Sequence, residues 1–229
     1  MKIIAHIRSD FPSKFGIPRQ SGLAPSLQAQ IIFEPAYRNP DALRGLEDFS
    51  HIWLLWQFSE AIRETWSPTV RPPRLGGNHR VGVFARRSPF RPNPIGLSSV
   101  KLEDILWDCP QAPVLLVSGA DLMDGTPIYD IKPYISMDSH PEAICGYSDA
   151  HKNDRLQVEI PAKWLQLVPL EKQQALYEVL AHDPRPAYQN QPERIYGFTF
   201  AGLEIKFTVK GNDLQVCWLG NASLEMIDE

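Results

Sequence analysis

Six arginines lie within residues 71–96 of this chain, RPPRLGGNHRVGVFARRSPFRPNPIG. The same segment holds five prolines and four glycines and contains neither Asp nor Glu. Proline fixes φ and removes a backbone donor, so the segment should form a stiff loop rather than a helix or a central strand. The arginine side chain carries a planar fork of donors that matches carboxylate and phosphate groups. The segment therefore predicts a preformed site for an anion such as nucleic acid.

The same composition has a second interpretation, a solvated linker in the polyproline II conformation. Linkers are mostly polar, whereas here apolar residues are interleaved with the charges. They are Val81, Val83, Phe84, Ile95 and, just beyond the segment, Leu97. The interleaving favours a folded loop that carries a site.

Asp121 and Asp124 form a pair of carboxylates where an apolar run meets Asp-Gly-Thr-Pro. An Asp before Gly-Thr-Pro often stabilises a turn by bonding to the nearby backbone. Alternatively, these carboxylates and the exposed backbone groups accept hydrogen bonds from an amine or hydroxyl of a ligand. The sequence leaves both interpretations open.

A second short motif is Asp-Pro-Arg-Pro-Ala-Tyr at residues 183–188. Arg185 and Tyr188, held by two prolines after a helix, could bind a nucleotide through charge and stacking. The motif could also be only a rigid end of the helix.

Several familiar sites are missing from the sequence, including a Gly-x-Gly-x-x-Gly loop after a strand, a Walker loop and a His-Glu-x-x-His helix. His140, Cys145 and His151 are close in sequence, but no fourth metal ligand is evident. The other cysteines, Cys109 and Cys217, form no Cys-x-x-Cys pair. We therefore expect no metal site.

The composition describes a folded protein with a locally concentrated positive charge. The chain has 229 residues, 43% of them hydrophobic, and a net charge of −4. General polyanion binders are basic throughout, so any anion site here must be local. Arg8 and Asp10 interrupt the start before a signal peptide could form, and the strongly apolar run at residues 52–56 is too short to span a membrane. With its isolated cysteines, the chain is expected to be soluble and cytoplasmic, with no membrane partner.

The elements that must position these residues are mostly strands. Short apolar or alternating runs separated by turns predict strands at residues 3–7, 31–33, 51–58, 98–106 and 113–122. Little helix lies between them, which favours an antiparallel sheet that closes into a barrel. Asn39 and Pro40 predict the start of a short helix that ends near Gly45.

A polar, turn-rich stretch at residues 137–155 predicts a linker, and we divide the chain into domains at 1–143 and 144–229. The second domain should contain a strand within residues 158–165 and an amphipathic helix with Leu170, Leu176, Val179 and Leu180 on its apolar face. Further strands are predicted at 195–200, 205–209 and 214–219, with a tight turn at 211–213.

Six motifs together resemble a known family. In chain order they are PRQSGL at 18–23, RGLEDFSHIWLL at 44–55, RPPRLGGN at 71–78, GVFARRSPFRPNPIG at 82–96, DLMDGTPIYDIKPY at 121–134 and DPRPAY at 183–188. Their types and order resemble the TsaA-type tRNA methyltransferases, the tRNA (adenine-N6)-methyltransferase O family.

The resemblance implies a mainly β N-terminal domain, an antiparallel β-barrel rather than a Rossmann sheet, followed by a small α+β C-terminal domain that is expected to contact tRNA. It implies an S-adenosylmethionine-dependent enzyme that methylates N6 of N6-threonylcarbamoyladenosine at position 37 of threonine tRNA, beside the anticodon. It further implies a homodimer with the cofactor near the subunit interface. A noncatalytic RNA-binding or S-adenosylmethionine-sensing module of the same fold is the alternative, and an enzyme of the same fold acting on a small adenine-like substrate is another.

The resemblance also assigns residues to roles. The cofactor is expected at Pro18, Arg19, Gln20, Ser59, Glu60, Arg87, Leu97, Asp121, Leu122, Met123 and Asp124. Ser59-Glu60 departs from the family pattern of His or Asp followed by Gln. Residues expected to bind tRNA are Arg71, Arg74, Arg86 and Arg91 at phosphates, and Arg185 and Tyr188 at bases. Asp121 and Asp124 are the candidates for accepting a proton from the amine.

Overall fold

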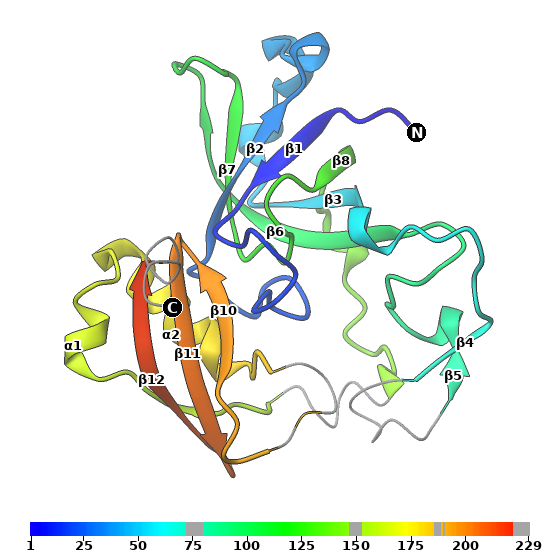
Figure 1. Cartoon of the computed structure of the whole chain (residues 1–229). Helices are drawn as coiled ribbons and strands as arrows, with labels where there is room; N and C mark the ends of the chain where they lie inside the picture. Colours follow the sequence, from blue (N-terminus) through cyan, green and yellow to red (C-terminus); the bar gives the residue numbers. More distant parts are fainter. Residues whose placement is uncertain (72–79, 147–152, 186–188, 190, 222–229) are drawn as a thin grey trace.

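A closed β-barrel and a smaller α+β part lie side by side in the computed structural model (Figure 1). The structure describes residues 1–71, 80–146, 153–185, 189 and 191–221. All strand pairs of the barrel are antiparallel, which confirms the expected fold class. In barrel order the strands are β1 (Ala5–Arg8), β2 (Gln28–Phe33), β7 (Val114–Ser118), β6 (Ile95–Leu106), β3 (His51–Gln57) and β8 (Pro127–Pro133).

Alternation of side chains decides which residues fill the barrel. In β3 every second residue is buried, so Ile52, Leu54 and Trp56 point inward. The antiparallel partner β6 pairs Trp56 with Gly96 and Leu54 with Ser98, and both partners are buried. A period of two places one face of each strand in the core. One of these inward positions is therefore polar, and it belongs to the site described below.

The sequence missed one barrel strand, β8. Pro127 and Pro133 stand at its two ends, where a missing N–H disturbs the ladder least, and the residues between them pair with β3. The strand predicted at 113–122 ends at Ser118, before the Asp121 segment. Asn39 caps a turn as expected, since its side chain accepts a hydrogen bond from the Asp41 N–H, but the helix is a short 3-10 helix.

Short 3-10 helices and one two-stranded ribbon complete the barrel part. The ribbon pairs β4 (Thr69–Val70) with β5 (Val81–Gly82). The 3-10 helices cover Pro35–Tyr37, Pro40–Leu43, Leu46–Asp48, Ser59–Ala61, Val83–Ala85 and Ser136–Asp138.

The C-terminal part is a four-stranded sheet in the order β10-β11-β12-β9, accompanied by two α-helices in the described part of the chain. Its elements are β9 (Gln157–Glu159), α1 (Ala162–Leu165), α2 (Leu170–Ala181), β10 (Tyr196–Phe200), β11 (Leu203–Lys210) and β12 (Asp213–Asn221). β9 is parallel to β12, and the other pairs are antiparallel.

Two predictions for this part were wrong. The strand expected within 158–165 ends at Glu159, because Pro161 opens α1 and proline suits the start of a helix better than a strand. Leu170 is the first residue of α2 and is 82% exposed, whereas Leu176, Val179 and Leu180 are buried as predicted.

The connection from β1 to β2 belongs to both parts. Its residues Phe11, Ala24 and Leu27 are buried in the core of the C-terminal sheet and helix, not in the barrel core. Phe11 packs against the rings of Phe198 and Phe200. Two polar contacts reinforce this packing, Lys172 to Asp10 at 2.6 Å and Ser26 to Glu178 at 2.8 Å. The C-terminal part therefore holds the segment that carries Pro18, Arg19 and Gln20.

Two glycines of this connection allow the packing to be measured. Gly16 and Gly22 have φ of 82° and 76°, but a Cβ would overlap the Phe198 ring at Gly16 and meets nothing within 4 Å at Gly22. We expect Gly22→Ala to lower the free energy of unfolding by about 1 kcal/mol through backbone strain. Gly16→Ala should lower it by about 2–4 kcal/mol, because overpacking is added. Urea unfolding of both variants measures the difference, and equal losses would show that Gly16 is not packed against Phe198.

Candidate functional site

A short chain of polar side chains crosses one end of the barrel. Trp56 Nε1 donates to Ser98 Oγ at 2.9 Å, and Ser98 Oγ donates to Asp121 Oδ1 at 2.5 Å. Gly96 makes room for the indole, since a Cβ there would overlap the Trp56 ring. The sequence missed Ser98 and Trp56. The available signal was Ser98 itself, a polar residue at an inward position of an alternating strand.

Asp121 follows β7 and is only partly exposed. Burial disfavours its charged form and raises the pKa of its carboxyl to about 6. The Ser98 hydrogen bond, the charge of Arg87 and the backbone N–H of Ser21 oppose this rise without cancelling it. A carboxyl group with a pKa close to neutral can hold or release a proton under physiological conditions.

The structure brings three predicted cofactor residues together at Asp121. Arg87 Nη1 donates to Gln20 Oε1 at 2.6 Å, and the Arg87 charge acts on the Asp121 carboxylate. Gln20 also donates from Nε2 to the Arg19 carbonyl at 2.6 Å. Gln20, Arg87 and Asp121 thus form one group, although 101 positions separate the first from the last in the sequence.

Asp124 lies in the same loop but has a structural contact. Its Oδ1 accepts a hydrogen bond from the Ser9 N–H at 2.9 Å, which joins the loop to the end of β1. Leu122 is 1% exposed and its side chain belongs to the barrel core. Met123 is partly buried, and its carbonyl accepts from Thr126. Of the two carboxylates in this loop, Asp121 is therefore the one that joins the polar chain across the barrel end, whereas Asp124 holds the loop to β1.

The remaining predicted cofactor residues do not belong to the barrel core. Leu97, on β6, is 49% exposed, and Pro18 is buried in the β1–β2 connection. Ser59 and Glu60 are exposed in a 3-10 helix after β3. Glu60 forms an ion pair with Lys14 of the β1–β2 connection, with Nζ and Oε2 3.6 Å apart. The departure from the family pattern at 59 and 60 thus lies next to the connection.

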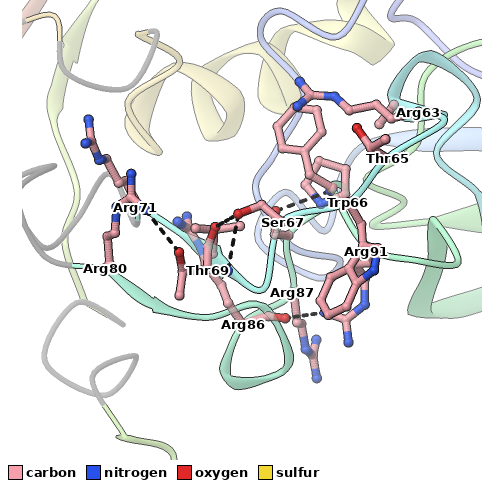
Figure 2. Close-up of a pocket in the computed structure, with 15 residues that line it drawn as sticks. Arg63, Thr65, Trp66, Ser67, Thr69, Arg71, Arg80, Arg86, Arg87 and Arg91 are labelled. Carbon is pink, nitrogen blue, oxygen red and sulfur yellow. Dashed lines mark hydrogen bonds between the residues drawn. The ribbon is translucent and has the colours of Figure 1, made fainter.

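A cavity of about 550 Å³ lies beside this group, with Arg87 among its lining residues (Figure 2). It opens around the β4–β5 ribbon. Most of its polar lining is arginine: Arg63, Arg71, Arg80, Arg86, Arg87 and Arg91. Trp66 and Phe90 add aromatic faces. No Asp or Glu lines it among the described residues, so the cavity suits an anionic ligand with stacking groups.

The arginines of the cavity differ in their contacts. Arg91 is partly buried and its Nη1 donates to the carbonyls of Val83 and Arg86, at 3.1 and 2.5 Å. Arg63 lies over the Phe90 ring at 3.9 Å. Arg80 is exposed, with one bond of 3.4 Å to the Thr69 hydroxyl. Arg91 therefore holds the loop together, whereas Arg63 and Arg80, which the sequence did not single out, carry exposed charge.

The second motif is built as a brace after α2. Arg185 donates to the Asp183 carboxylate twice, from Nε at 2.7 Å and from Nη2 at 2.8 Å, and its side chain is 12% exposed. This geometry favours the structural interpretation of Arg185 over a contact with a base. Tyr188, like Arg74, lies outside the described residues.

The described residues offer neither a metal site nor a membrane-spanning helix. They contain no group of three or more His, Cys, Asp or Glu side chains that could hold a metal ion. His151 of the trio considered above lies outside the described residues. None of the helices in the described ranges is long and apolar enough to cross a membrane.

Comparisons with known proteins agree on one family. The model of the tRNA-methyltransferase O N-terminal domain matches residues 6–139, and that of the TrmO C-terminal domain matches residues 153–222. The tRNA (adenine(37)-N6)-methyltransferase of Escherichia coli strain K12 is 47% identical over 215 residues, 90% of each chain.

Two Pseudomonas aeruginosa proteins extend the match. One is named as a candidate S-adenosylmethionine-dependent methyltransferase and is 40% identical over 222 residues, which are 92% of this chain and 93% of that protein. The crystal structure of TrmO from this organism matches with a TM-score of 0.77 and 34% identity, over 96% of this chain and 95% of the other.

The raised pKa of Asp121 predicts a pH-dependent stability. The folded state keeps this proton up to about pH 6 and the unfolded chain only to about pH 4, so folding loses stability as pH rises through that window. Asp121→Asn keeps the side-chain size and removes the ionisation. Its free energy of unfolding relative to the parent should rise between pH 4 and 6 by at most about 3 kcal/mol and then stay constant. Urea titrations across pH 4–8 measure this, and a constant difference would contradict it.

Proposed function

The chain belongs to the tRNA-methyltransferase O family, and we propose that it methylates N6 of N6-threonylcarbamoyladenosine at position 37 of threonine tRNA. The chain is an S-adenosylmethionine-dependent methyltransferase that acts on N6 of adenine 37 in tRNA. Our proposal adds that this adenine carries a threonylcarbamoyl group and that the substrates are the threonine isoacceptors.

The environment of Asp121 is the observation that supports the proposal most. When bound, S-adenosylmethionine supplies a methyl group on a sulfonium, which a nitrogen lone pair displaces in line. The N6 lone pair is delocalised, so a group that accepts the N6 proton strengthens the nucleophile. With a pKa of about 6, Asp121 is mostly ionised at neutral pH and can take that proton on a carboxylate oxygen. Ser98 orients the carboxylate by its hydrogen bond.

The neighbouring residues fit the cofactor. Arg87 is exposed and forms no ion pair within the described part of the chain, so its remaining donors are available to a carboxylate such as that of the methionine moiety. Leu97 offers a half-exposed apolar surface to a flat ring. We assign Pro18, Arg19 and Gln20 to the same site, since Gln20 bonds to Arg87. Ser59, Glu60, Leu122, Met123 and Asp124 would contribute at most backbone or peripheral contacts.

The arginine-lined cavity supports binding of tRNA beside the methyl-transfer site. We propose that Arg71, Arg80 and Arg86 contact phosphates, and that Arg63 joins them. Arg91 is proposed to shape the loop, because its Nη1 donates to two carbonyls of the loop. For Arg74 and Tyr188 the proposed tRNA contacts rest on the family resemblance alone.

We also propose a cytoplasmic homodimer with the cofactor near the subunit interface, as the family resemblance implies. A domain boundary at residues 143 and 144 is supported by the gap between the two family models, which end at residue 139 and begin at residue 153. The β1–β2 connection is the exception, because it packs into the second core.

Methyl transfer to tRNA tests the proposed reaction. Purified protein with labelled S-adenosylmethionine should methylate threonine tRNA that bears the threonylcarbamoyl group, and the same transcript without that group is the control. Asp121→Asn should lower kcat about 10²- to 10⁴-fold, because it removes the proton acceptor. Asp124→Asn should have little effect, because an amide oxygen can still accept from Ser9.

Equal methylation of both transcripts would remove the threonylcarbamoyl requirement from the proposal. Binding of cofactor and tRNA with no transfer would support the noncatalytic alternative. Equal losses in both aspartate variants would remove the assignment to Asp121.

The cavity yields a separate prediction about salt. Arg80→Ala should raise the Kd for tRNA about 3- to 10-fold and reduce the slope of log Kd against log salt by about 1, since one phosphate contact is lost. The matched control is Lys163→Ala on α1, at the opposite side of the molecule from the β4–β5 ribbon (Figure 1). Filter binding from 50 to 300 mM salt measures both. A slope that is unchanged in Arg80→Ala would exclude a phosphate contact.

A further inference from the structure

The end of α2 has an unusual backbone conformation next to the β1–β2 connection. Asp183 has φ of 55°, in the left-handed region that non-glycine residues rarely adopt. A residue in this conformation commonly follows the last turn of a helix, but it is usually Gly or Asn. Here its carbonyl accepts a hydrogen bond from Arg19 Nη2 at 3.3 Å. The helix end thus contacts the proposed cofactor segment directly.

The Asp183 side chain stabilises this conformation. Its carboxylate accepts two hydrogen bonds from the Arg185 guanidinium and one from the Arg185 backbone N–H at 3.4 Å, two residues away across Pro184. Burial opposes ionisation of Asp183, but the bonds and charge of Arg185 and the charge of Arg19 outweigh it and hold the pKa below its ordinary value. A bidentate pair in a largely buried setting fixes both geometry and charge. Loss of the carboxylate would remove this bidentate partner from Arg185, whose side chain is 12% exposed.

Hydrogen bonds continue from Arg19 to the methyl-transfer site. The Arg19 carbonyl accepts from Gln20 Nε2 at 2.6 Å, and Gln20 Oε1 accepts from Arg87 Nη1 at 2.6 Å. The Arg87 charge in turn acts on Asp121. A contiguous set of polar contacts therefore runs from the end of α2 to the proposed proton acceptor.

Apolar and polar contacts together hold the middle of the connection, since Ile17 packs on the C-terminal core and Gly16 lies against Phe198. Residues 14–19 and the end of α2 line a hollow of about 180 Å³. The buried anchors Phe11, Ala24 and Leu27 lie on either side of this stretch in the sequence. The hydrogen bond from Arg19 to the Asp183 carbonyl crosses this hollow and adds to the apolar packing in setting the position of the cofactor segment.

We propose that Asp183 is a positioning residue for S-adenosylmethionine binding, which acts through Arg19 and Gln20 on the guanidinium of Arg87. The proposal rests on the proposed function, because it takes Pro18, Arg19, Gln20 and Arg87 as cofactor residues. It gives the C-terminal part a role in cofactor binding that does not require tRNA.

The test is calorimetric titration of the full chain with S-adenosylmethionine and no tRNA. Asp183→Asn keeps the backbone carbonyl and removes the charge that attracts Arg19 and pairs with Arg185, so it should raise the Kd about 3- to 30-fold. Asp183→Gly, which tolerates the left-handed conformation and also removes the carboxylate, should do the same and serves if the first variant folds poorly. In methyl-transfer assays the pH at half-maximal kcat should rise, because Arg87 then stabilises ionised Asp121 less.

The matched control is Lys172→Met, which breaks an ion pair with Asp10 at the same interface but outside this set of contacts. It should lower thermal stability and leave the cofactor Kd unchanged. The double variant Asp183→Asn, Gln20→Met should bind no more weakly than Gln20→Met alone, since both act on one route.

Two outcomes would overturn the inference and leave Asp183 with a purely structural role. One is that the losses of affinity are additive in the double variant. The other is that Lys172→Met raises the cofactor Kd as much as Asp183→Asn does. Equal cofactor Kd values in the parent and Asp183→Asn would overturn this inference but not the proposed function. Failure of the parent to bind S-adenosylmethionine would instead overturn the proposed function on which it rests.

Discussion

The β1–β2 connection depends on a core that is not its own. Phe11, Ala24 and Leu27 leave the barrel and are buried among the strands and helix of the C-terminal part. Without that burial, the connection would be a long surface loop with little to offset the entropy of ordering it. Its order in turn places Gln20 against Arg87, and Arg87 near Asp121. The two parts of the chain are therefore joined at the site as well as by the polypeptide.

A second constraint is the concentration of positive charge. No Asp or Glu is among the described residues that line the arginine-rich cavity, whereas the chain as a whole is negative. Like charges at short range repel, so this arrangement costs stability unless an anion is bound. The cost is limited by contacts within the loop: Arg91 bonds to two carbonyls and Arg63 lies over Phe90. The same stiff loop thus contributes one arginine to the group around Asp121 and others to the lining of the cavity.

Prediction from sequence succeeded where the signal was local. Alternation identified β3 and β6, and the spacing of apolar residues identified α2. It failed where proline is compatible with more than one structure. Pro127 and Pro133 made the segment of β8 look unlike a strand, and Pro161 precedes a helix in a segment expected to be a strand. The sequence could not decide whether Asp121 or Asp124 is the better candidate for the proton acceptor. The two differ in burial and in their hydrogen-bond partners, Ser98 and Ser9.

By itself, the sequence determined the barrel with its small α+β partner, the family and the arginine-rich site, because periodicity, proline content and motif order are properties of the chain. Tertiary structure alone decided which of these residues meet. Ser98 and Trp56 join Asp121 only when the barrel closes, and Arg185 turns to Asp183 only when α2 ends in a left-handed residue. The reason is physical: a pKa or a hydrogen bond depends on burial and on neighbours that are distant in sequence, and folding sets both.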